Sequence, residues 1–264
     1  MYIIKWDEML LPYEQAISEL GNKFRSLASG YEALGRPCPI ELVAQRLKRP
    51  SSILAKAKRK GVPLDMLEEG IEDIAGIRLI CRFMEDIDDV VKIIRARDGR
   101  DMRIKTERDY LTKPKASGYR SYHIIVHYPL MCALGWKEVT CEIQIRTMAM
   151  NYWAVIEHDL QYKHDGNLPP DIRAALLEHA RTTDELDKEF SRVHRACIDG
   201  DKKQYSRLML VDELIKNIRM LSRSSKATEA KAYGLRLIEM YENGSREDFL
   251  KAVEETADIL NKLL

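Results

Sequence analysis

Hydrophobic residues in the first part of the chain recur first with the period of a helix and then with the period of a strand. Residues 7–34 carry apolar side chains three and four positions apart, at Leu10, Tyr13, Ile17, Leu20, Phe24 and Leu27. This spacing predicts one amphipathic helix, which ends at the sequence GRPCP. Residues 41–48 fit a short strand, and a period of two places Arg46 and Lys48 on the same face of that strand.

Three later segments alternate between apolar and polar residues. In residues 139–146 one face is apolar, and the other carries Thr140, Glu142, Gln144 and Arg146. In residues 121–128 the side chains alternate between two faces, and His123 lies on one of them. Residues 77–83, which follow the sequence IEDIAG, also alternate, and Arg78 lies on their polar face. Such alternation predicts half-buried strands, so the polar faces of neighbouring strands can line a single cleft.

Helical periods separate these strands. We expect helices in residues 50–60, 85–97, 147–163 and 169–193, and a charged loop in residues 97–118. Strands separated by helices predict an α+β fold, a mixed β-sheet flanked by helices, extending over residues 1–202.

The hydrophobic pattern changes in residues 203–264, which show only the period of a helix. Three amphipathic pieces are separated by the sequences SRSSKAT and YENGSRED. Their apolar stripes must be covered, so we expect a compact all-α extension of about three helices. Because its pieces carry no metal or nucleotide cluster, we expect this extension to serve packing rather than catalysis.

Composition limits the location and the partners of the protein. The 43 Lys and Arg nearly balance the 42 Asp and Glu, for a formal charge of +1, so any site for a polyanion must be local. The five cysteines contain no CxxC pair, which argues against a zinc site or a disulfide framework and favours a cytoplasmic protein. There is no apolar run of the roughly 18 residues that cross a bilayer, and the N-terminus is too acidic for a secretory signal, so no membrane partner is expected.

The strongest local charge bias lies in residues 46–60, which contain seven basic residues and no acid. Ser51 and Ser52 stand at the start of the helix in this segment, where hydroxyl and backbone donors favour anions, and Lys56 and Arg59 follow about one and two turns later. The segment is therefore a candidate phosphate site. A solvated helix face is the alternative interpretation of such a run.

Two carboxylates, Asp73 and Glu142, stand near these basic residues in the predicted fold. Mg²⁺ in nucleotide sites takes one or two protein carboxylates and completes its shell with phosphate oxygens and water, so the pattern favours phosphoryl or pyrophosphoryl transfer. Each residue also has a structural interpretation. Tyr119 could fill a core edge, His123 could be a satisfied buried imidazole, and Glu142 could form an ion pair with Arg78 or Arg146.

Taken together, the motifs DIAGIR, SGYRSYH and EIQIRT, followed by MNYWA, resemble the synthetase domain of the RelA/SpoT family, and most closely its small alarmone synthetases. The resemblance covers about residues 5–200. It implies transfer of the β,γ-pyrophosphate of ATP to the ribose 3′-hydroxyl of GDP or GTP, which makes ppGpp or pppGpp.

The resemblance also implies roles for individual residues. Asp73 matches the magnesium-binding aspartate, and Glu142 matches the glutamate that helps to hold the metal and is proposed to act as general base. Arg46 and Arg78 match arginines that stack on adenine, and Tyr119 matches the tyrosine that stacks on guanine. The other matched residues bind ATP phosphates (Lys48, Ser52, Lys56 and Arg59) or the acceptor nucleotide (Lys115, His123, Gln144 and Asn151).

The family also suggests partners. It implies a homo-oligomer, specifically a tetramer, and a (p)ppGpp effector that binds basic groups of the first helix and an aromatic residue near the first strand. The corresponding positions of this sequence hold Gly21, Arg25 and Leu42, so the match to the family's effector-binding residues is partial. About seventy residues precede Asp73, too few for the hydrolase domain of the long family members, so alarmone degradation is not expected.

Two other functions fit parts of the pattern. Some small relatives are toxins that pyrophosphorylate tRNA or adenine nucleotides, and base stacking alone does not exclude such acceptors. Residues 46–60 could instead bind single-stranded RNA in a regulator, although the two carboxylates and the small net charge favour the enzyme.

Overall fold

The computed structural model of this protein describes residues 4–164, 167–201 and 207–263. The chain forms two compact units, residues 1–193 and 194–264. Helix α6 (Pro170–Asp201) begins in the first unit and continues into the second. The boundary that we expected between residues 202 and 203 falls outside the described residues, so the division into 1–202 and 203–264 stays a prediction.

The first unit is built on a five-stranded sheet with the order β1-β2-β5-β4-β3. The strands are β1 (Leu42–Leu47), β2 (Ala75–Cys81), β3 (Arg103–Asp109), β4 (Tyr122–Cys132) and β5 (Gly135–Thr147). β2 and β5 are parallel, and the other neighbours are antiparallel. The sheet is therefore mixed, which confirms the α+β fold expected from the sequence.

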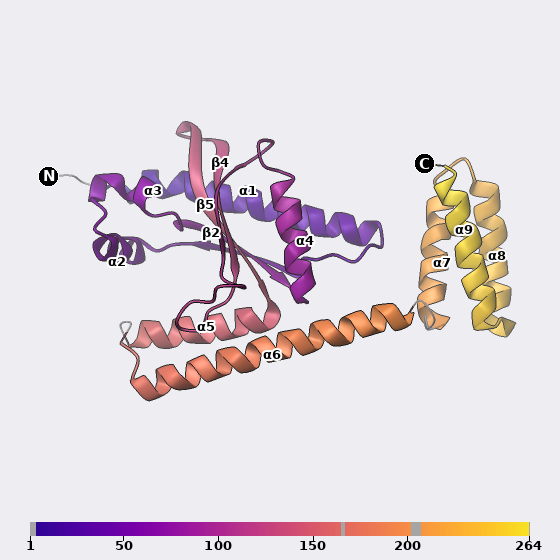
Figure 1. Ribbon diagram of the computed structural model, residues 1–264. Coiled ribbons are helices and arrows are strands. Elements are labelled where there is room, and N and C mark those ends of the chain that lie inside the picture. Colours follow the sequence, from indigo (N-terminus) through magenta and orange to yellow (C-terminus); the bar gives the residue numbers. More distant parts are fainter. Residues whose placement is uncertain (1–3, 165–166, 202–206, 264) are drawn as a thin grey trace. The chain divides into compact units, whose positions relative to one another are not determined.

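Helices α1 (Trp6–Ala33) and α4 (Met84–Arg95) pack against the sheet, as Figure 1 shows. They share one apolar core with the odd-numbered residues of β2 and β5, such as Ile77, Leu79, Ile143 and Ile145. The even-numbered residues of these strands point to the opposite face because side chains alternate along a strand. That face carries the polar residues singled out above.

Besides α1, α4 and α6, the described part of the first unit contains four further helical segments. They are α2 (Pro50–Lys60), the short 3₁₀ helix η1 (Leu64–Met66), α3 (Leu67–Gly70) and α5 (Met148–Lys163). Helices α5 and α6 lie side by side (Figure 1), joined by a hydrogen bond of 2.9 Å from the Trp153 indole to the Leu176 carbonyl. Among the described residues, no helix combines the length and the apolar character needed to span a membrane.

One sequence prediction was wrong. Residues 97–118, expected to be a loop, contain strand β3, which pairs with β4 at the edge of the sheet. Ile104 is its only large apolar residue, and its charged side chains form ion pairs, such as Glu107 with Arg95 and Arg108 with Glu72, each at 2.6 Å. An edge strand needs charges rather than apolar alternation, so the hydrophobic pattern carries no signal for it.

The second unit contains a three-helix bundle, which confirms the helical extension expected from the sequence. Its helices are α7 (Arg207–Ser222), α8 (Ala227–Asn243) and α9 (Arg246–Asn261). Their shared core contains Leu210, Val211, Leu214, Met240, Phe249 and Ala252. The buried Asn217 amide donates to the Thr256 hydroxyl at 3.0 Å, which satisfies the polar groups inside the bundle.

A buried carboxylate joins α6 to the end of β5. The Thr147 hydroxyl donates to Asp187 Oδ2 at 2.7 Å and accepts from the Met150 amide at 3.1 Å, which caps α5. Burial, together with the charge of Asp184, raises the pKa of Asp187 to about 6, despite the hydrogen bond from Thr147. The ionised form of Asp187 is therefore disfavoured in the folded protein.

We expect Asp187→Asn to stabilise the protein near pH 7.5. Because the pKa of Asp187 is higher in the folded than in the unfolded chain, wild-type stability falls as the pH rises from about 4 through about 6, and the asparagine removes that loss. Urea or thermal unfolding at pH 4.5 and 7.5 measures the difference, at about 2–4 °C of melting temperature per kcal/mol. Asp184→Asn is the control: it removes the 2.6 Å ion pair to Arg120 and should destabilise. Equal pH dependence in Asp187→Asn and wild type would contradict the expectation.

Candidate active site

The strand register gathers most of the predicted site residues on one face of the sheet. Across the strands, Arg46 pairs with Gly76 and Gly76 with Glu142, while Arg78 pairs with Gln144 and Gln144 with His123. Residues that pair directly across strands point to the same face. Five side chains from four strands therefore share the face opposite the α1–α4 core.

Asp73 lies just before β2 and receives two lysines. Lys48 Nζ and Lys56 Nζ each lie 2.7 Å from Asp73 Oδ2, while Asp73 Oδ1 is buried without a hydrogen-bond partner. Burial by itself raises the pKa of Asp73, but the two lysine hydrogen bonds outweigh it and hold the pKa below its ordinary value. Asp73 is thus an ionised carboxylate with one oxygen left for a ligand.

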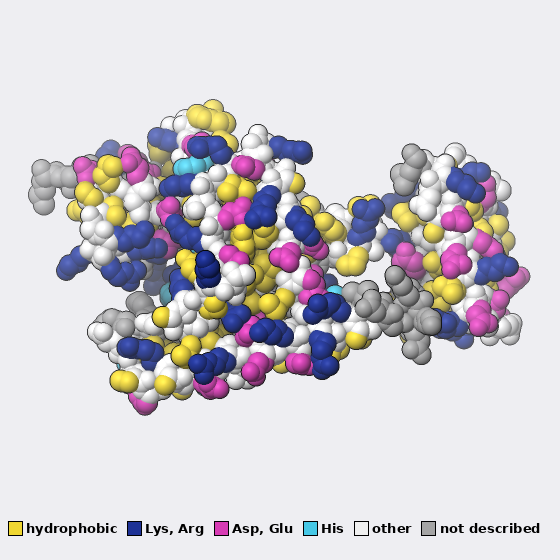
Figure 2. All heavy atoms as spheres, viewed as in Figure 1, with side chains coloured by type: hydrophobic (Ala, Val, Ile, Leu, Met, Phe, Trp, Pro, Cys, Tyr) yellow, Lys and Arg dark blue, Asp and Glu magenta, His cyan; other side chains and the backbone are white. Residues whose placement is uncertain are grey.

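Helix α2 presents its N-terminus and its basic residues near this carboxylate. Pro50 occupies the first turn together with the half-buried Ser52, and the first turn contains no acidic residue. Figure 2 shows basic side chains gathered over α2, which carries Lys56, Lys58, Arg59 and Lys60. Among the described residues, Ser52 and Arg59 form no side-chain hydrogen bond or ion pair. The structure therefore joins Lys56 to Asp73 but leaves Arg59 exposed at the far end of the helix.

Five side chains form a closed hydrogen-bonded ring around Glu142. Arg146 donates to the Tyr119 hydroxyl at 2.9 Å, and that hydroxyl lies 2.9 Å from His123 Nε2. His123 Nδ1 lies 2.9 Å from Glu142 Oε1. On the other arm Arg146 donates to Gln144, whose amide donates to Glu142 Oε2 at 2.7 Å. Both arms begin at Arg146 and end at Glu142.

The partners of this ring fit one tautomer of a neutral His123. The Tyr119 hydroxyl accepts from Arg146 and can give its own hydrogen to His123 Nε2. A neutral His123 then carries its hydrogen on Nδ1 and donates it to Glu142. Burial raises the pKa of Glu142, but the hydrogen bonds from His123 and Gln144 outweigh it, so the pKa lies below its ordinary value. The ring thus holds an ionised glutamate in one orientation.

Two of the alternatives raised for these residues can now be assessed. Glu142 is held by His123 and Gln144 rather than by an ion pair with Arg78 or Arg146. His123 is a satisfied, buried imidazole, and its partner is the candidate carboxylate itself. The structural and functional interpretations of His123 therefore coincide.

Tyr119 packs between the site and helices α5 and α6. Its ring lies 6.5 Å from that of Trp153, and Lys115 Nζ lies 4.6 Å from its centroid. Gly118, with φ of +88°, allows this position, because a Cβ there would lie 2.5 Å from Ala180 of α6. A larger residue would meet both backbone strain and a collision.

Positive charge concentrates on the sheet face despite the small net charge of the chain. Burial and then the charges of Arg146 and Arg46 lower the pKa of Arg78. His158 of α5 also lies near this charge, since burial and the charges of Arg46 and Arg78 lower its pKa. Asn151 of the same helix has a buried Oδ1 without a hydrogen-bond partner, which leaves it available to a ligand.

Sequence reasoning missed the importance of Arg146 and the direct pairing of Lys48 with Asp73. Arg146 is 3% exposed and begins both arms of the ring. Its place on the polar face of residues 139–146 was the available signal. Lys48 and Asp73 are 25 positions apart, and the sequence carried no sign of their contact.

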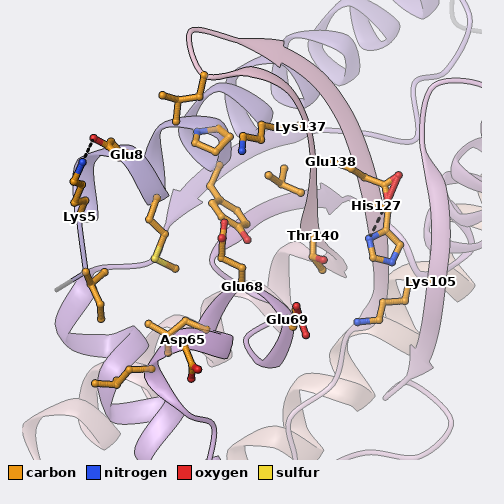
Figure 3. A pocket seen from close by; sticks show the side chains of 18 residues that line it. Lys5, Glu8, Asp65, Glu68, Glu69, Lys105, His127, Lys137, Glu138 and Thr140 are labelled. Atoms are coloured by element: carbon orange, nitrogen blue, oxygen red, sulfur yellow. Dashed lines mark hydrogen bonds and ion pairs between the residues drawn. The ribbon is translucent and has the colours of Figure 1, made fainter. Parts of the chain in front are cut away.

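A cavity of about 730 Å³ in the first unit lies elsewhere. Its lining, shown in Figure 3, includes Asp65, Glu68 and Glu69 from η1 and α3 and Lys137 and Thr140 of β5. None of the thirteen predicted site residues lines it. The candidate site is therefore the polar sheet face and its borders.

The donor set of this face suits a magnesium ion with nucleotide phosphates. Asp73 and Glu142 supply carboxylate oxygens, and the buried Asp73 Oδ1 without a partner is an atom that a cation would satisfy. Among the described residues there is no cluster of three or more metal-binding side chains. The two carboxylates fit an ion that takes one or two protein ligands and completes its shell with phosphate oxygens and water.

Comparison with known proteins places these features in a family. Residues 45–167 match the family described as the region found in RelA / SpoT proteins, and this range includes all the predicted site residues. The chain is 44% identical over 189 residues to the GTP pyrophosphokinase YjbM of Bacillus subtilis, with 72% of this chain and 88% of YjbM aligned. It is 38% identical to the GTP pyrophosphokinase YwaC of the same organism, over 70% of this chain and 88% of YwaC.

Solved structures agree. The crystal structure of small alarmone synthetase 1 from Bacillus subtilis bound to its product pppGpp superposes with a TM-score of 0.70 at 43% identity, covering 73% of this chain and 97% of that one. The same enzyme bound to AMPCPP gives a TM-score of 0.64 at 39% identity, over 74% and 98% of the two chains. This chain therefore belongs to the RelA/SpoT family and is of the small alarmone synthetase type.

Proposed function

We propose that this protein transfers the β,γ-pyrophosphate of ATP to the ribose 3′-hydroxyl of GDP or GTP, which produces ppGpp or pppGpp and AMP. In this reaction the 3′-oxygen forms a bond to the β-phosphorus as the bond to the bridging oxygen of AMP breaks. The observation that carries the proposal is the pair of ionised carboxylates, Asp73 and Glu142, on a face rich in Lys and Arg. The names and bound nucleotides of the relatives support the same reaction.

We assign metal binding to Asp73 and Glu142. A bound Mg²⁺ would neutralise phosphate charge and stabilise the charge that develops during transfer. Lys48 and Lys56, which contact Asp73, lie where their ammonium groups can turn to phosphate oxygens. Ser52 and Arg59 extend the phosphate contacts along α2. Glu142, ionised and oriented by the ring, accepts the proton of the 3′-hydroxyl.

The two nucleotides have separate places in this proposal. Arg46 and Arg78 occupy diagonal positions on neighbouring strands, about 7–8 Å apart, a distance that admits one flat base between two guanidinium groups. ATP binds there through adenine. The acceptor binds beside Tyr119, with Gln144 and Asn151 as hydrogen-bonding groups. Stacking of guanine on Tyr119 displaces Lys115 from the ring, and the freed ammonium can reach the acceptor phosphates.

Incubation of the pure protein with γ-labelled ATP, Mg²⁺ and GDP or GTP tests the proposal. We expect label in ppGpp or pppGpp and an equal amount of AMP. Parallel reactions with tRNA or adenine nucleotides as acceptors test the toxin-type alternative. Label transferred to those acceptors and not to guanine nucleotides, or no transfer at all, would refute the proposal.

We expect Tyr119→Ala to raise the KM for the acceptor. Loss of base stacking costs about 1–3 kcal/mol, or roughly 5- to 150-fold. Tyr119→Phe is the matched control, because it keeps the stacking ring and removes only the hydroxyl that joins Arg146 and His123. Its acceptor KM should stay near the wild-type value while kcat falls. If Tyr119→Ala changed only the KM for ATP, Tyr119 would contact ATP rather than the acceptor, and its assignment would be wrong.

The remaining parts of the proposal concern assembly and location. We propose a cytoplasmic homo-oligomer, a tetramer by resemblance to the family. A (p)ppGpp effector and binding of single-stranded RNA stay predictions from the sequence. At one expected effector position, Gly21, an added Cβ would lie 1.8 Å from Gln45 Nε2, so the Gln45 side chain occupies the space that a larger residue would need.

We also propose that residues 203–264 are dispensable for catalysis. A chain ending at residue 202 should keep pyrophosphate transfer within about an order of magnitude, because every proposed site residue lies between Arg46 and Asn151. Initial rates, solubility and mass in solution measure the outcome. Loss of synthesis in a truncated protein that stays folded and soluble would contradict this division of labour.

A further inference from the structure

The outer face of α8 carries an apolar stripe that its own bundle does not cover. The inner face uses Ala230, Tyr233, Leu237 and Met240 to pack on the bundle core. On another face, Leu235, Ile238 and Tyr241 follow at intervals of three residues and are 61%, 61% and 60% exposed. Residues at this spacing form one continuous line along a helix.

We propose that this stripe is a self-association surface, on which α8 of a second copy of the chain packs in antiparallel orientation. The charges at the two ends of the stripe identify the partner. Lys231 stands at one end and Glu242 at the other, both exposed, and among the described residues neither forms an ion pair.

An antiparallel pair centred between Leu235 and Ile238 is self-complementary. A two-fold axis at that point places Leu235 of one copy opposite Ile238 of the other. The same axis places Lys231 opposite Glu242, twice per dimer. A parallel pair would instead set Lys231 beside Lys231 and Glu242 beside Glu242, so charge selects the antiparallel arrangement.

Gly234 adds a second, independent reason for close contact with another helix. It lies in the middle of α8, where glycine lowers helix stability relative to alanine. A Cβ at Gly234 would meet nothing within 4 Å in the chain, so no internal contact requires the glycine. It borders the stripe, next to Leu235, and lets the backbone of a facing helix approach closely.

The size of the stripe indicates the strength of the association. Three apolar side chains cover less than the roughly 800 Å² that each partner buries in a stable interface. The pairing is therefore of modest affinity and depends on protein concentration. This self-association involves only residues of the C-terminal extension and does not depend on the reaction proposed above.

Sedimentation of the full-length protein over a range of concentrations tests this proposal. Ile238→Glu buries an unpaired carboxylate at the centre and should raise the dissociation constant of this step at least about 10-fold. Glu242→Lys should raise it about 2- to 10-fold, and the double variant Lys231→Glu with Glu242→Lys should restore it, because the swapped charges again face each other. Glu254→Lys, the same charge change at an exposed position of α9 outside the stripe, is the matched control and should have no effect.

Two results would overturn the proposal. The first is an association constant that Ile238→Glu leaves unchanged; a lower melting temperature of the same variant would then mean that another part of the same chain covers the stripe. The second is a double charge swap that is weaker than either single change. Circular dichroism of each variant confirms that the bundle remains folded.

Discussion

Replacing Asp73 with asparagine should lower pyrophosphate transfer by on the order of 10²- to 10³-fold or more. The substitution removes the negative charge of one of the two carboxylates assigned to the metal, a carboxylate with one oxygen buried without a partner. It keeps the size of the side chain, so a loss of activity reports charge rather than packing. Steady-state rates with ATP, Mg²⁺ and GDP measure the effect.

Nucleotide binding separates this role from a general loss of structure. In the wild type, Lys48 and Lys56 contact Asp73, and the neutral asparagine holds both ammonium groups more weakly, which leaves them more available to phosphate oxygens. We therefore expect ATP to bind the variant without Mg²⁺ at least as tightly as it binds the wild type. Asp65→Asn, an exposed aspartate outside the site, is the control and should keep its activity. Full turnover in Asp73→Asn would remove the metal assignment.

Replacing Glu142 with glutamine should have an effect of the same order, for a different reason. Both oxygens of Glu142 accept hydrogen bonds, one from His123 and one from Gln144. An amide offers one acceptor and one donor, so one arm of the ring loses its bond in addition to the loss of the base. We expect turnover to fall by on the order of 10³-fold while both nucleotides still bind.

His123→Phe distinguishes orientation of Glu142 from its chemistry. The substitution removes one hydrogen bond to Glu142 and one contact of Tyr119, but keeps the carboxylate and the Gln144 arm. Loss of a group that orients a metal ligand usually costs about 10- to 100-fold, so this variant should retain more activity than Glu142→Gln. If His123→Phe were as inactive as Glu142→Gln, His123 would have a direct role in the reaction. If it were fully active, the ring would not position the base.

The local sequence determined the elements whose side chains alternate or recur with a strong apolar period. The pattern of residues 139–146 predicted a strand with one polar face. The pattern of residues 7–34 predicted the long helix that covers the opposite face. Short motifs around Asp73, Tyr119 and Glu142 were specific enough to indicate the family, because each is a run of neighbouring residues that the sequence alone displays. The three helices of the extension also followed from their stripes, each of which needs a partner.

Only the tertiary structure decided how these residues meet. Strand β3 escaped the sequence pattern because an edge strand is held by pairing with β4 and by ion pairs rather than by apolar burial. The ring through Arg146, Tyr119 and His123 closes because β4 lies beside β5 and places residues 27 and 19 positions apart within hydrogen-bond distance. The contacts of Lys48 and Lys56 with Asp73 likewise join separate segments. Periodicity reports which side of an element is buried, whereas a charged site depends on distances between elements, and only the folded chain sets those.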